Sequence, residues 1–439
     1  MNKNSKNISA QKEGKKIIPG LTQILSKRPD QFAPYSWPGY YSKAKGTYIW
    51  DLDNSKFLDM SISAIGSIIL GYANKDVDRS VIEAIKKGNS SSLNSYEEIT
   101  LAKLLCSLHP WAEKVRYSKT GGEAMTIAIR IARSYNKKYK LAICGYHGWH
   151  DWYLAANLKS KKNLNTHLLK GLESIGVPKS LKNTISSFRM NYFNDLKKIK
   201  KIKRLAAIIM EVQREKEPNL NFLKEIRSFC NQKKIILIFD ECTSGFRETY
   251  GGIHKNYNIT PDIALFGKCL GNGYPITAIL GKKKYLKKAS KSFISSTFWT
   301  ENSGFVAALK TLEIMKKKKT YKKVKIIGKK IKSIWKKLAS KYTLPIEIYG
   351  LDSIPSFKIL SKDSAKYKTF ITQEMLKNRI LATNTIYISI AHKNEYLKEY
   401  TKILDKIFLK IKYCEENKLS INKILKSKVS TSDFNRLTG

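Results

Sequence analysis

Two polar side chains follow apolar segments that have the length and composition of buried strands. Lys268 comes after the segment 263–266 and before the turn Gly271-Asn272-Gly273. Asp240 comes directly after the apolar segment 235–239. A lysine amine can bond covalently to an aldehyde, and a carboxylate can hold a proton on a ring nitrogen. The two residues together therefore match the chemistry of pyridoxal phosphate.

Lys268 alone would not support this interpretation. The chain has 82 lysines and arginines, so a lysine beside any motif is most simply a solvated surface residue. The interpretation depends on whether other residues suited to the same cofactor follow neighbouring strands.

A glycine pair at residues 121 and 122 could bind the phosphate group. It lies between a short predicted strand, 115–118, and an amphipathic helix, 123–135. Free N–H groups at a helix N-terminus attract phosphate, and glycine lets the anion approach the backbone. Taken by itself, the motif would more simply be an ordinary strand-to-helix turn.

An aromatic and a sulfur side chain could enclose a flat cofactor ring. Tyr146 follows a predicted strand and could stack on the ring. Cys242 lies two residues after Asp240 and would point the same way if the strand continued. His147 and His150 suggest a metal, but no third ligand lies nearby, so we expect no metal site.

Short apolar segments alternate with amphipathic helices from about residue 76. This alternation predicts an α/β fold, with a mainly parallel sheet covered by helices and ligands at the carboxyl ends of the strands. The predicted strands are 115–118, 141–144, 205–210, 235–239, 263–266 and 276–280, and the predicted helices include 77–87, 98–108, 123–135 and 222–233.

The domain organisation follows from the same patterns. We expect a flexible arm at residues 1–20 and the N-terminal part of a small domain at 21–75, including a hairpin at 46–59. A large cofactor-binding domain would span 76–320, and the C-terminal part of the small domain would span 321–439.

Composition narrows the class of protein. No segment approaches the ~18 apolar residues of a membrane span, so we expect no membrane partner and a cytoplasmic location. The net charge of +47 could indicate nucleic-acid binding. The lysine runs are dispersed and lack interleaved aromatics, which favours compositional bias and no nucleic-acid partner. Six cysteines without a CxxC pair indicate neither a zinc site nor a disulfide framework.

In this order, the motifs resemble the class III, pyridoxal phosphate-dependent aminotransferases. The matching segments are Thr120-Gly121-Gly122-Glu123-Ala124, Tyr146-His147-Gly148, the run 240–247 and the segment that ends at Lys268. The resemblance extends from about Pro19 to near the C-terminus. It implies the type I fold of these transferases, with a mainly parallel seven-stranded sheet in a large domain and a smaller α+β domain from both chain ends.

The resemblance also implies roles that the residues alone do not show. Thr297 would contact the cofactor phosphate across a dimer interface, which implies a homodimer. Glu211 and Glu123 would lie near the active site. The small-molecule partners would be an amino donor and a carbonyl acceptor.

Two reactions remain open. Segments 70–72, 176–178 and 250–252 resemble glutamate-1-semialdehyde 2,1-aminomutase. Segments 354–357, 387–392 and 434–437 are more similar to aminomutase-like aminotransferases found with surface-polysaccharide genes. The segment 296–302, the pair Lys119-Thr120 and Cys242 depart from the aminomutase pattern. We favour the aminotransferase over the aminomutase, and a basic nucleic-acid-binding protein on a decayed enzyme fold is a remote alternative.

Overall fold

The computed structural model describes residues 5–34, 36–165, 167 and 171–431. The chain forms two compact units. The large unit is Lys75–Tyr321, and the small unit combines Met1–Asn74 with Lys322–Gly439.

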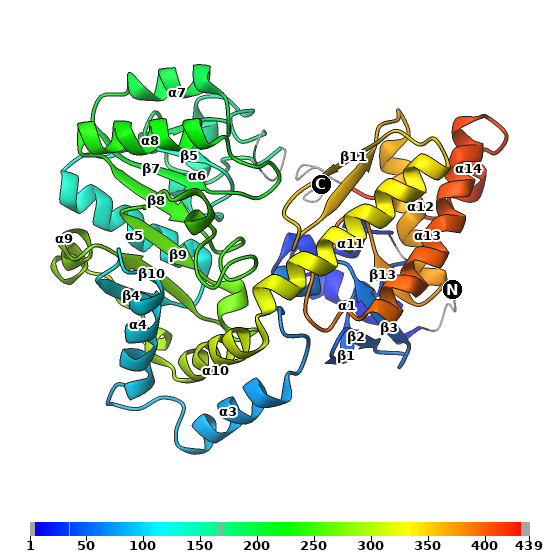
Figure 1. Cartoon of the computed structure of the whole chain (residues 1–439), viewed down its shortest axis with the longest axis horizontal. Helices are drawn as coiled ribbons and strands as arrows, with labels where there is room; N and C mark the ends of the chain where they lie inside the picture. Colours follow the sequence, from blue (N-terminus) through cyan, green and yellow to red (C-terminus); the bar gives the residue numbers. More distant parts are fainter. Residues whose placement is uncertain (1–4, 35, 166, 168–170, 432–439) are drawn as a thin grey trace. The chain divides into compact units, whose positions relative to one another are not determined.

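A seven-stranded sheet in the order β4-β10-β9-β8-β7-β5-β6 forms the centre of the large unit (Figure 1). Its strands are β4 (Lys114–Ser118), β5 (Lys140–Cys144), β6 (Ile185–Ser187), β7 (Leu205–Glu211), β8 (Ile236–Asp240), β9 (Ile263–Phe266) and β10 (Thr277–Gly281). Strands β9, β8, β7, β5 and β6 pair in parallel, whereas β10 is antiparallel to both β4 and β9. The predicted α/β fold with a mainly parallel seven-stranded sheet is confirmed.

Helices pack against this sheet and against one another. Helix α5 (Gly121–Asn136) buries Ala124, Ile127, Ala128 and Ile131 on one face and packs against β4 and β7 to β10. Helix α10 packs against α3 and α4, and α8 packs against β8 and α7. The remaining helices are α3 (Lys75–Lys86), α4 (Tyr96–Leu108), α6 (Asp151–Leu154), α7 (Phe193–Lys200), α8 (Leu220–Lys233), α9 (Lys283–Leu286) and α10 (Ser303–Lys318). Short 3-10 turns include η5 (Ile253–Tyr257), η6 (Lys268–Leu270) and η8 (Thr297–Thr300).

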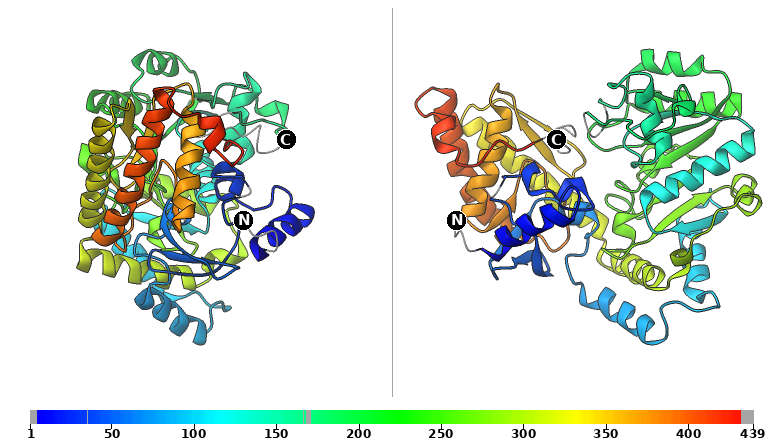
Figure 2. Two further views of the ribbon diagram at one scale, coloured as in Figure 1. Left: turned by 90° about the vertical axis from the view of Figure 1, so that its right-hand side faces the viewer. Right: turned by 180° about the vertical axis from the view of Figure 1, so that it is seen from behind.

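Both chain ends build the small unit (Figure 2). Strand β13 (Ile380–Ala382) pairs in parallel with β3 (Lys56–Met60), which joins the two parts into a sheet of order β1-β2-β3-β13. The other elements are α1 (Lys6–Ile17), β1 (Tyr41–Lys45), β2 (Tyr48–Asp51), α2 (Ser63–Gly66), α11 (Thr320–Lys341), β11 (Ile346–Tyr349), β12 (Ser356–Ile359), α12 (Ser364–Lys377), α13 (Asn394–Glu415) and α14 (Ile421–Ile424). The predicted hairpin is the β2–β3 pair.

Residues 6–17 form helix α1, in place of the flexible arm that the sequence favours. The Asp53 carboxylate, on the β2–β3 turn, accepts hydrogen bonds from the amides of Lys6 (2.8 Å) and Asn7 (3.4 Å) and from the Ser5 hydroxyl. These bonds satisfy N–H groups that a helix N-terminus leaves without partners. A carboxylate distant in sequence therefore helps to order the first turn.

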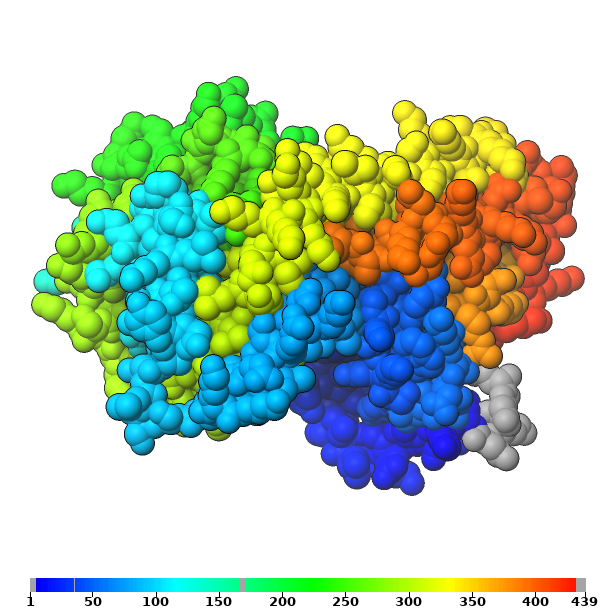
Figure 3. Space-filling model, turned by 60° about the horizontal axis from the view of Figure 1, so that its bottom comes forward, coloured from blue at the N-terminus to red at the C-terminus, as the bar shows by residue number. Residues whose placement is uncertain are grey.

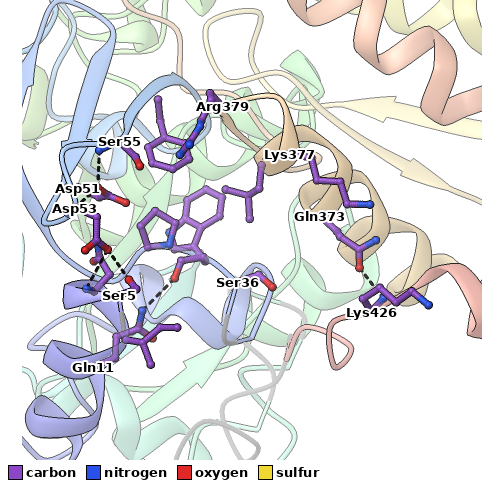
Figure 4. A pocket seen from close by; sticks show the side chains of 16 residues that line it. Ser5, Gln11, Ser36, Asp51, Asp53, Ser55, Gln373, Lys377, Arg379 and Lys426 are labelled. Carbon is purple, nitrogen blue, oxygen red and sulfur yellow. Dashed lines mark hydrogen bonds between the residues drawn. The ribbon is translucent and has the colours of Figure 1, made fainter. Parts of the chain in front are cut away.

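A cavity of about 620 Å³ lies in the small unit beside α1 (Figure 4). Trp37 and Phe57 contribute aromatic surface to its lining. Its buried Gln373 amide already bonds to the backbone of Ile424 and Lys426, and Asp51 bonds to the amides of its own turn.

In the described part of the chain, no helix is long and apolar enough to cross a membrane.

Candidate active site

Three of the predicted residues lie at or just after the carboxyl ends of parallel strands, at one edge of the sheet. Asp240 and Glu211 are the last residues of β8 and β7, and they are partners in the strand register. Lys268 begins η6, two residues after β9 ends. Its amine donates a 2.9 Å hydrogen bond to the hydroxyl of Thr243, in the turn after β8. The structure thus brings the Lys268 amine to the end of the strand that carries Asp240.

The backbone at Lys268 has an uncommon conformation. Its φ of +44° lies in the left-handed region, which costs a residue with a Cβ about 1 kcal/mol or more. Strain of this kind is concentrated at functional sites, where the surrounding structure enforces it. The neighbouring turn residues therefore fix the direction in which the lysine leaves the strand.

The Asp240 carboxylate is buried and doubly hydrogen-bonded. Its Oδ2 accepts a 2.8 Å hydrogen bond from His147 Nδ1, and its Oδ1 accepts a 3.2 Å bond from the Cys242 amide. Burial raises the pKa of this carboxyl, but the bonds from His147 and Cys242 outweigh burial, so that the pKa lies below its usual value. Asp240 is therefore an anion held in a fixed orientation.

Cys242 lies between two glycine turns. A Cβ on Gly121 would be 3.4 Å from its sulfur, and a Cβ on Gly267 would be 3.6 Å from it. The prediction that Cys242 points the same way as Asp240 required the strand to continue. Strand β8 ends at Asp240, and Cys242 lies in the turn that follows. Burial and the nearby Asp240 carboxylate raise the pKa of the thiol well above its usual value, which keeps it protonated.

The amides of Gly121 and Gly122 are the first two of helix α5, and the helix itself offers them no acceptor. Thr120 and Glu123 form a capping box around this terminus. A Cβ on Gly122 would lie 2.5 Å from Cε1 of His150, so no larger residue fits there without moving the ring. The first two amides of α5 are therefore candidates to bind an anion.

The structure assigns the Glu123 carboxylate to the helix cap. It accepts hydrogen bonds from the amides of Lys119 (3.0 Å) and Thr120 (2.8 Å) and from the indole of Trp299 (3.2 Å). These partners hold the glycine turn and the η8 segment together. Because its oxygens accept these three hydrogen bonds, Glu123 holds the glycine turn in place and does not itself face a ligand as a base.

The structure brings Tyr146 and Glu211 together. The amide of Tyr146 donates a 3.0 Å hydrogen bond to Glu211 Oε2, and Arg214 forms a 3.0 Å ion pair with Oε1. The Tyr146 ring lies edge-on to Tyr153, with centroids 5.8 Å apart. A cavity of about 280 Å³ is lined by Glu211 and by Arg189, which pairs with Asp195.

Thr297 is exposed at the start of η8, and its predicted phosphate contact across a dimer interface is left as a prediction. The rest of its segment is tied to the glycine turn, because Lys119 forms an ion pair with Glu301. Sequence reasoning missed four contacts in the site: His147 on Asp240, Thr243 on Lys268, His150 over Gly122 and Arg214 on Glu211. His147 and His150 stood in view within one motif, but no pattern showed which side chains they would meet.

Solved structures that include transaminases share this fold. The FumI protein of Sphingopyxis sp. MTA144 aligns with a TM-score of 0.84 at 21% identity, covering 95% of this chain and 99% of that one. An omega-transaminase from Sphaerobacter thermophilus aligns with a TM-score of 0.82 at 20% identity, covering 94% and 98%. The protein therefore has the transaminase fold.

Residues 34–398 match the family model for class-III aminotransferases. The 3-aminobutyryl-CoA aminotransferase of Cloacimonas acidaminovorans (strain Evry) is 35% identical over 382 residues, 84% of this chain and 87% of the relative. The glutamate-1-semialdehyde 2,1-aminomutase of Wigglesworthia glossinidia brevipalpis is 32% identical over 440 residues, 93% and 98%. The chain belongs to the class-III aminotransferase family, and it is an enzyme.

Family membership confirms the predicted resemblance and the predicted cofactor, pyridoxal phosphate. The residues present fit this group. The site offers a lysine amine, a buried anionic carboxylate and two amides at the N-terminus of α5 that could bind a phosphate group.

Proposed function

We propose that this enzyme is an aminotransferase that moves an amino group between a small-molecule amino donor and a carbonyl acceptor. The observation that carries the proposal is the meeting of three groups at the strand ends. The Lys268 amine is bonded to the turn after β8, Asp240 ends β8, and the sulfur of Cys242 would lie 3.4 Å from a Cβ added at Gly121. An amine, an acid and a candidate anion-binding turn so arranged match the parts of one cofactor.

When bound, pyridoxal phosphate supplies an aldehyde that bonds to amines and a ring that draws electrons from the bond being broken. In the proposed assignment, Lys268 holds the cofactor at rest and, once displaced by the donor, moves a proton at the substrate carbon. The Thr243 hydroxyl orients the amine for both tasks, and Asp240 holds a proton on the ring nitrogen.

The remaining predicted residues bind and enclose the cofactor. The amides of Gly121 and Gly122 would bind the phosphate, and Tyr146 and Cys242 would cover the two ring faces. The Tyr146 amide is held by Glu211, so the ring position of Tyr146 depends on that carboxylate. Glu211 and Glu123 are thus proposed to position the site rather than to react.

A Lys268→Ala variant tests the assignment. The variant is expected to lose turnover and the visible absorbance of the protein with bound cofactor, because no amine remains to bond the aldehyde. Lys283→Ala, which changes an exposed lysine on α9, is the matched control and should behave as the parent enzyme. Retained absorbance and turnover in Lys268→Ala would show that the assignment is wrong.

We also propose a homodimer, with Thr297 reaching the phosphate site of the partner. Large apolar side chains are exposed on α3, on α4 and on the chain between them, including Ile85 (52%), Leu93 (83%) and Tyr96 (68%). Helices α3 and α4 form part of the face seen in Figure 3. An exposed apolar group of this kind is typical of a protein–protein interface. Phe298, beside Thr297, is similarly exposed.

Light scattering during size-exclusion chromatography tests the dimer. A Leu93→Asp, Tyr96→Lys double variant should shift the mass toward a monomer and weaken cofactor binding. Ile175→Asp, which changes another exposed apolar residue of the large unit, should not. A double variant that stays dimeric and binds the cofactor normally would exclude this surface.

All six cysteines are free thiols, which supports the proposed cytoplasmic location.

The aminomutase reaction is the second candidate, favoured by curated relatives of that name that match nearly over their whole length. Glutamate-1-semialdehyde supplied without an external donor would yield 5-aminolevulinate if the enzyme is the aminomutase. A transferase would need a separate donor and acceptor. A role in surface-polysaccharide metabolism rests on the resemblance of the C-terminal segments. The intact Lys268, Asp240 and Gly121 argue against a decayed fold that only binds nucleic acid.

A further inference from the structure

The cavity of about 620 Å³ beside α1 has the size of a small-molecule site. All of its lining residues lie in Met1–Asn74 or Lys322–Gly439, so the small unit builds it alone. The proposed active-site residues all belong to Lys75–Tyr321. The cavity is therefore made of residues that the proposed chemistry does not use.

Asn7, in the first turn of α1, lines the cavity with a side-chain amide that is satisfied at one atom only. Its Oδ1 accepts a 3.1 Å hydrogen bond from the amide of Tyr40, which fixes the orientation of the side chain. Asn7 is only 4% exposed, and its Nδ2 has no hydrogen-bond partner in the part of the chain that the structure describes. A buried donor without an acceptor is unfavourable, so a ligand that supplies an acceptor removes this cost.

An aromatic surface and two further donors lie in the same cavity. Trp37 stacks on Phe32, with ring centroids 4.1 Å apart, and the Arg379 guanidinium lies 5.5 Å from the centroid of the Phe57 ring. Trp37, Phe57 and Arg379 all line the cavity. Among the described residues, neither the indole N–H of Trp37 nor the guanidinium of Arg379 has a hydrogen-bond acceptor. Both groups are thus open to a ligand that carries acceptors.

The carboxylates of the cavity, by contrast, are bonded to the backbone. Asp51 accepts the amides of its own turn, and Asp53 accepts the first amides of α1. The carbonyl of Gln373 accepts the amide of Lys426 at 2.7 Å. In Figure 4, Lys377 and Lys426 are drawn on the side of the cavity opposite Asp51 and Asp53. The carboxylates hold the turn and the helix in place, which leaves the donors described above without acceptors.

We propose that this cavity binds a small organic anion with a flat apolar body. The oxygens of the ligand accept hydrogen bonds from Asn7 Nδ2 and from the Arg379 guanidinium, whose fork of donors suits a carboxylate or a phosphate. The flat body packs against Trp37 and Phe57. Because Asn7 and Arg379 come from the two chain segments that build the small unit, the ligand joins these segments and stabilises the folded protein.

Three probes with one flat body test the ligand class. 2-Naphthoate and 2-naphthyl phosphate carry an anion, whereas 2-naphthylmethylammonium carries a cation. Isothermal titration calorimetry is done on the enzyme kept saturated with pyridoxal phosphate, so that the cofactor site is filled. A ligand of this size should reach a Kd on the order of 1 mM, and the tighter of the two anions shows whether the site prefers carboxylate or phosphate. The cation should bind at least about tenfold more weakly than that anion.

Variants of the lining residues locate the binding. Arg379→Gln removes a charged donor and should weaken the anions by about tenfold or more. Asn7→Asp keeps the acceptor for the Tyr40 amide but puts a carboxylate oxygen in place of Nδ2, so it should weaken the anions and favour the cation. Lys362→Gln removes an exposed lysine of the small unit outside the cavity and should leave each Kd within about twofold.

The comparison of Arg379→Gln with Lys362→Gln carries the test if Asn7→Asp does not fold, as judged by circular dichroism. Equal anion binding by Arg379→Gln and the parent would place the probes elsewhere and overturn the proposal. A parent enzyme that binds the cation as tightly as the anions, or that binds neither anion, would overturn it as well. None of these results bears on the proposed aminotransferase reaction, which Lys268→Ala tests.

Discussion

Replacing Glu123 by alanine separates a structural role for this carboxylate from a chemical one. The change removes acceptors for two amides in the turn before α5 and for the indole of Trp299. Loss of a capping interaction costs about 0.5–2 kcal/mol, and loss of the indole bond adds about 0.5–1.5 kcal/mol. We expect the free energy of unfolding to fall by about 1–3 kcal/mol.

Urea unfolding measures this loss as a lower midpoint with an unchanged slope. Turnover at saturating cofactor and substrate should stay within about twofold of the parent. Glu123→Gln retains an acceptor for the Thr120 amide and should lose less stability. Glu313→Ala removes an exposed carboxylate of a surface ion pair on α10 and should be nearly neutral. A Glu123→Ala enzyme of parental stability but collapsed turnover would show that the carboxylate acts in the chemistry.

Two further changes test buried groups behind the site. The Glu241 carboxylate is fully buried and accepts hydrogen bonds from the amides of Ile253 and His254 and from the His254 ring. Glu241→Ala should therefore lower the free energy of unfolding in urea by about 3 kcal/mol or more. A loss below about 1 kcal/mol would contradict the importance of this network. Burial lowers the pKa of His109 to about 3. Below pH 6.5, His109 therefore binds a proton in the unfolded chain but stays neutral in the folded one. Stability should then fall by about 1.4 kcal/mol per pH unit between 6.5 and 3 from this residue, and His109→Gln should flatten that slope by one proton; an unchanged slope would refute the burial argument.

The sequence was sufficient for elements that end in a clear change of pattern. The predicted strand 235–239 and the observed β8 differ by one residue at each end, because an apolar run stops where polar residues begin. The antiparallel direction of β10 was not readable, since its apolar run is the same in either direction. The edge strand β6 has only three residues, two of them serines, which is too short for an apolar pattern to predict.

Contacts between distant segments were also outside the reach of pattern reasoning. Helix α1 is capped by Asp53, and nothing near residue 6 indicates that partner. His147 meets Asp240 because β5 and β8 end at the same edge of the sheet. The strand-end rule placed both residues near the site, but the direction of a side chain in a turn depends on backbone angles that the sequence does not state.

The two main departures from the family motifs touch each other. Lys119 forms an ion pair with Glu301, which lies in the departing segment 296–302, and both side chains are only 13% exposed. Burial raises the pKa of Glu301, but the hydrogen bonds from Lys119, Ser303 and Asn89 together outweigh burial, so that the pKa lies below its usual value. Leaving one such charge unpaired costs more than the pair gains, so each departure is unfavourable without the other.

The pair therefore acts as one change, and it sets where η8 and Thr297 lie beside the glycine turn. Lys119→Asn alone should destabilise the protein more than Lys119→Asn combined with Glu301→Gln. A double-mutant cycle in urea should give a coupling of about 1–3 kcal/mol. Additive effects would show that the contact is incidental. If the pair is coupled, a search for the origin of transferase or mutase activity must change both residues together, because a single change would also report the cost of the unpaired charge.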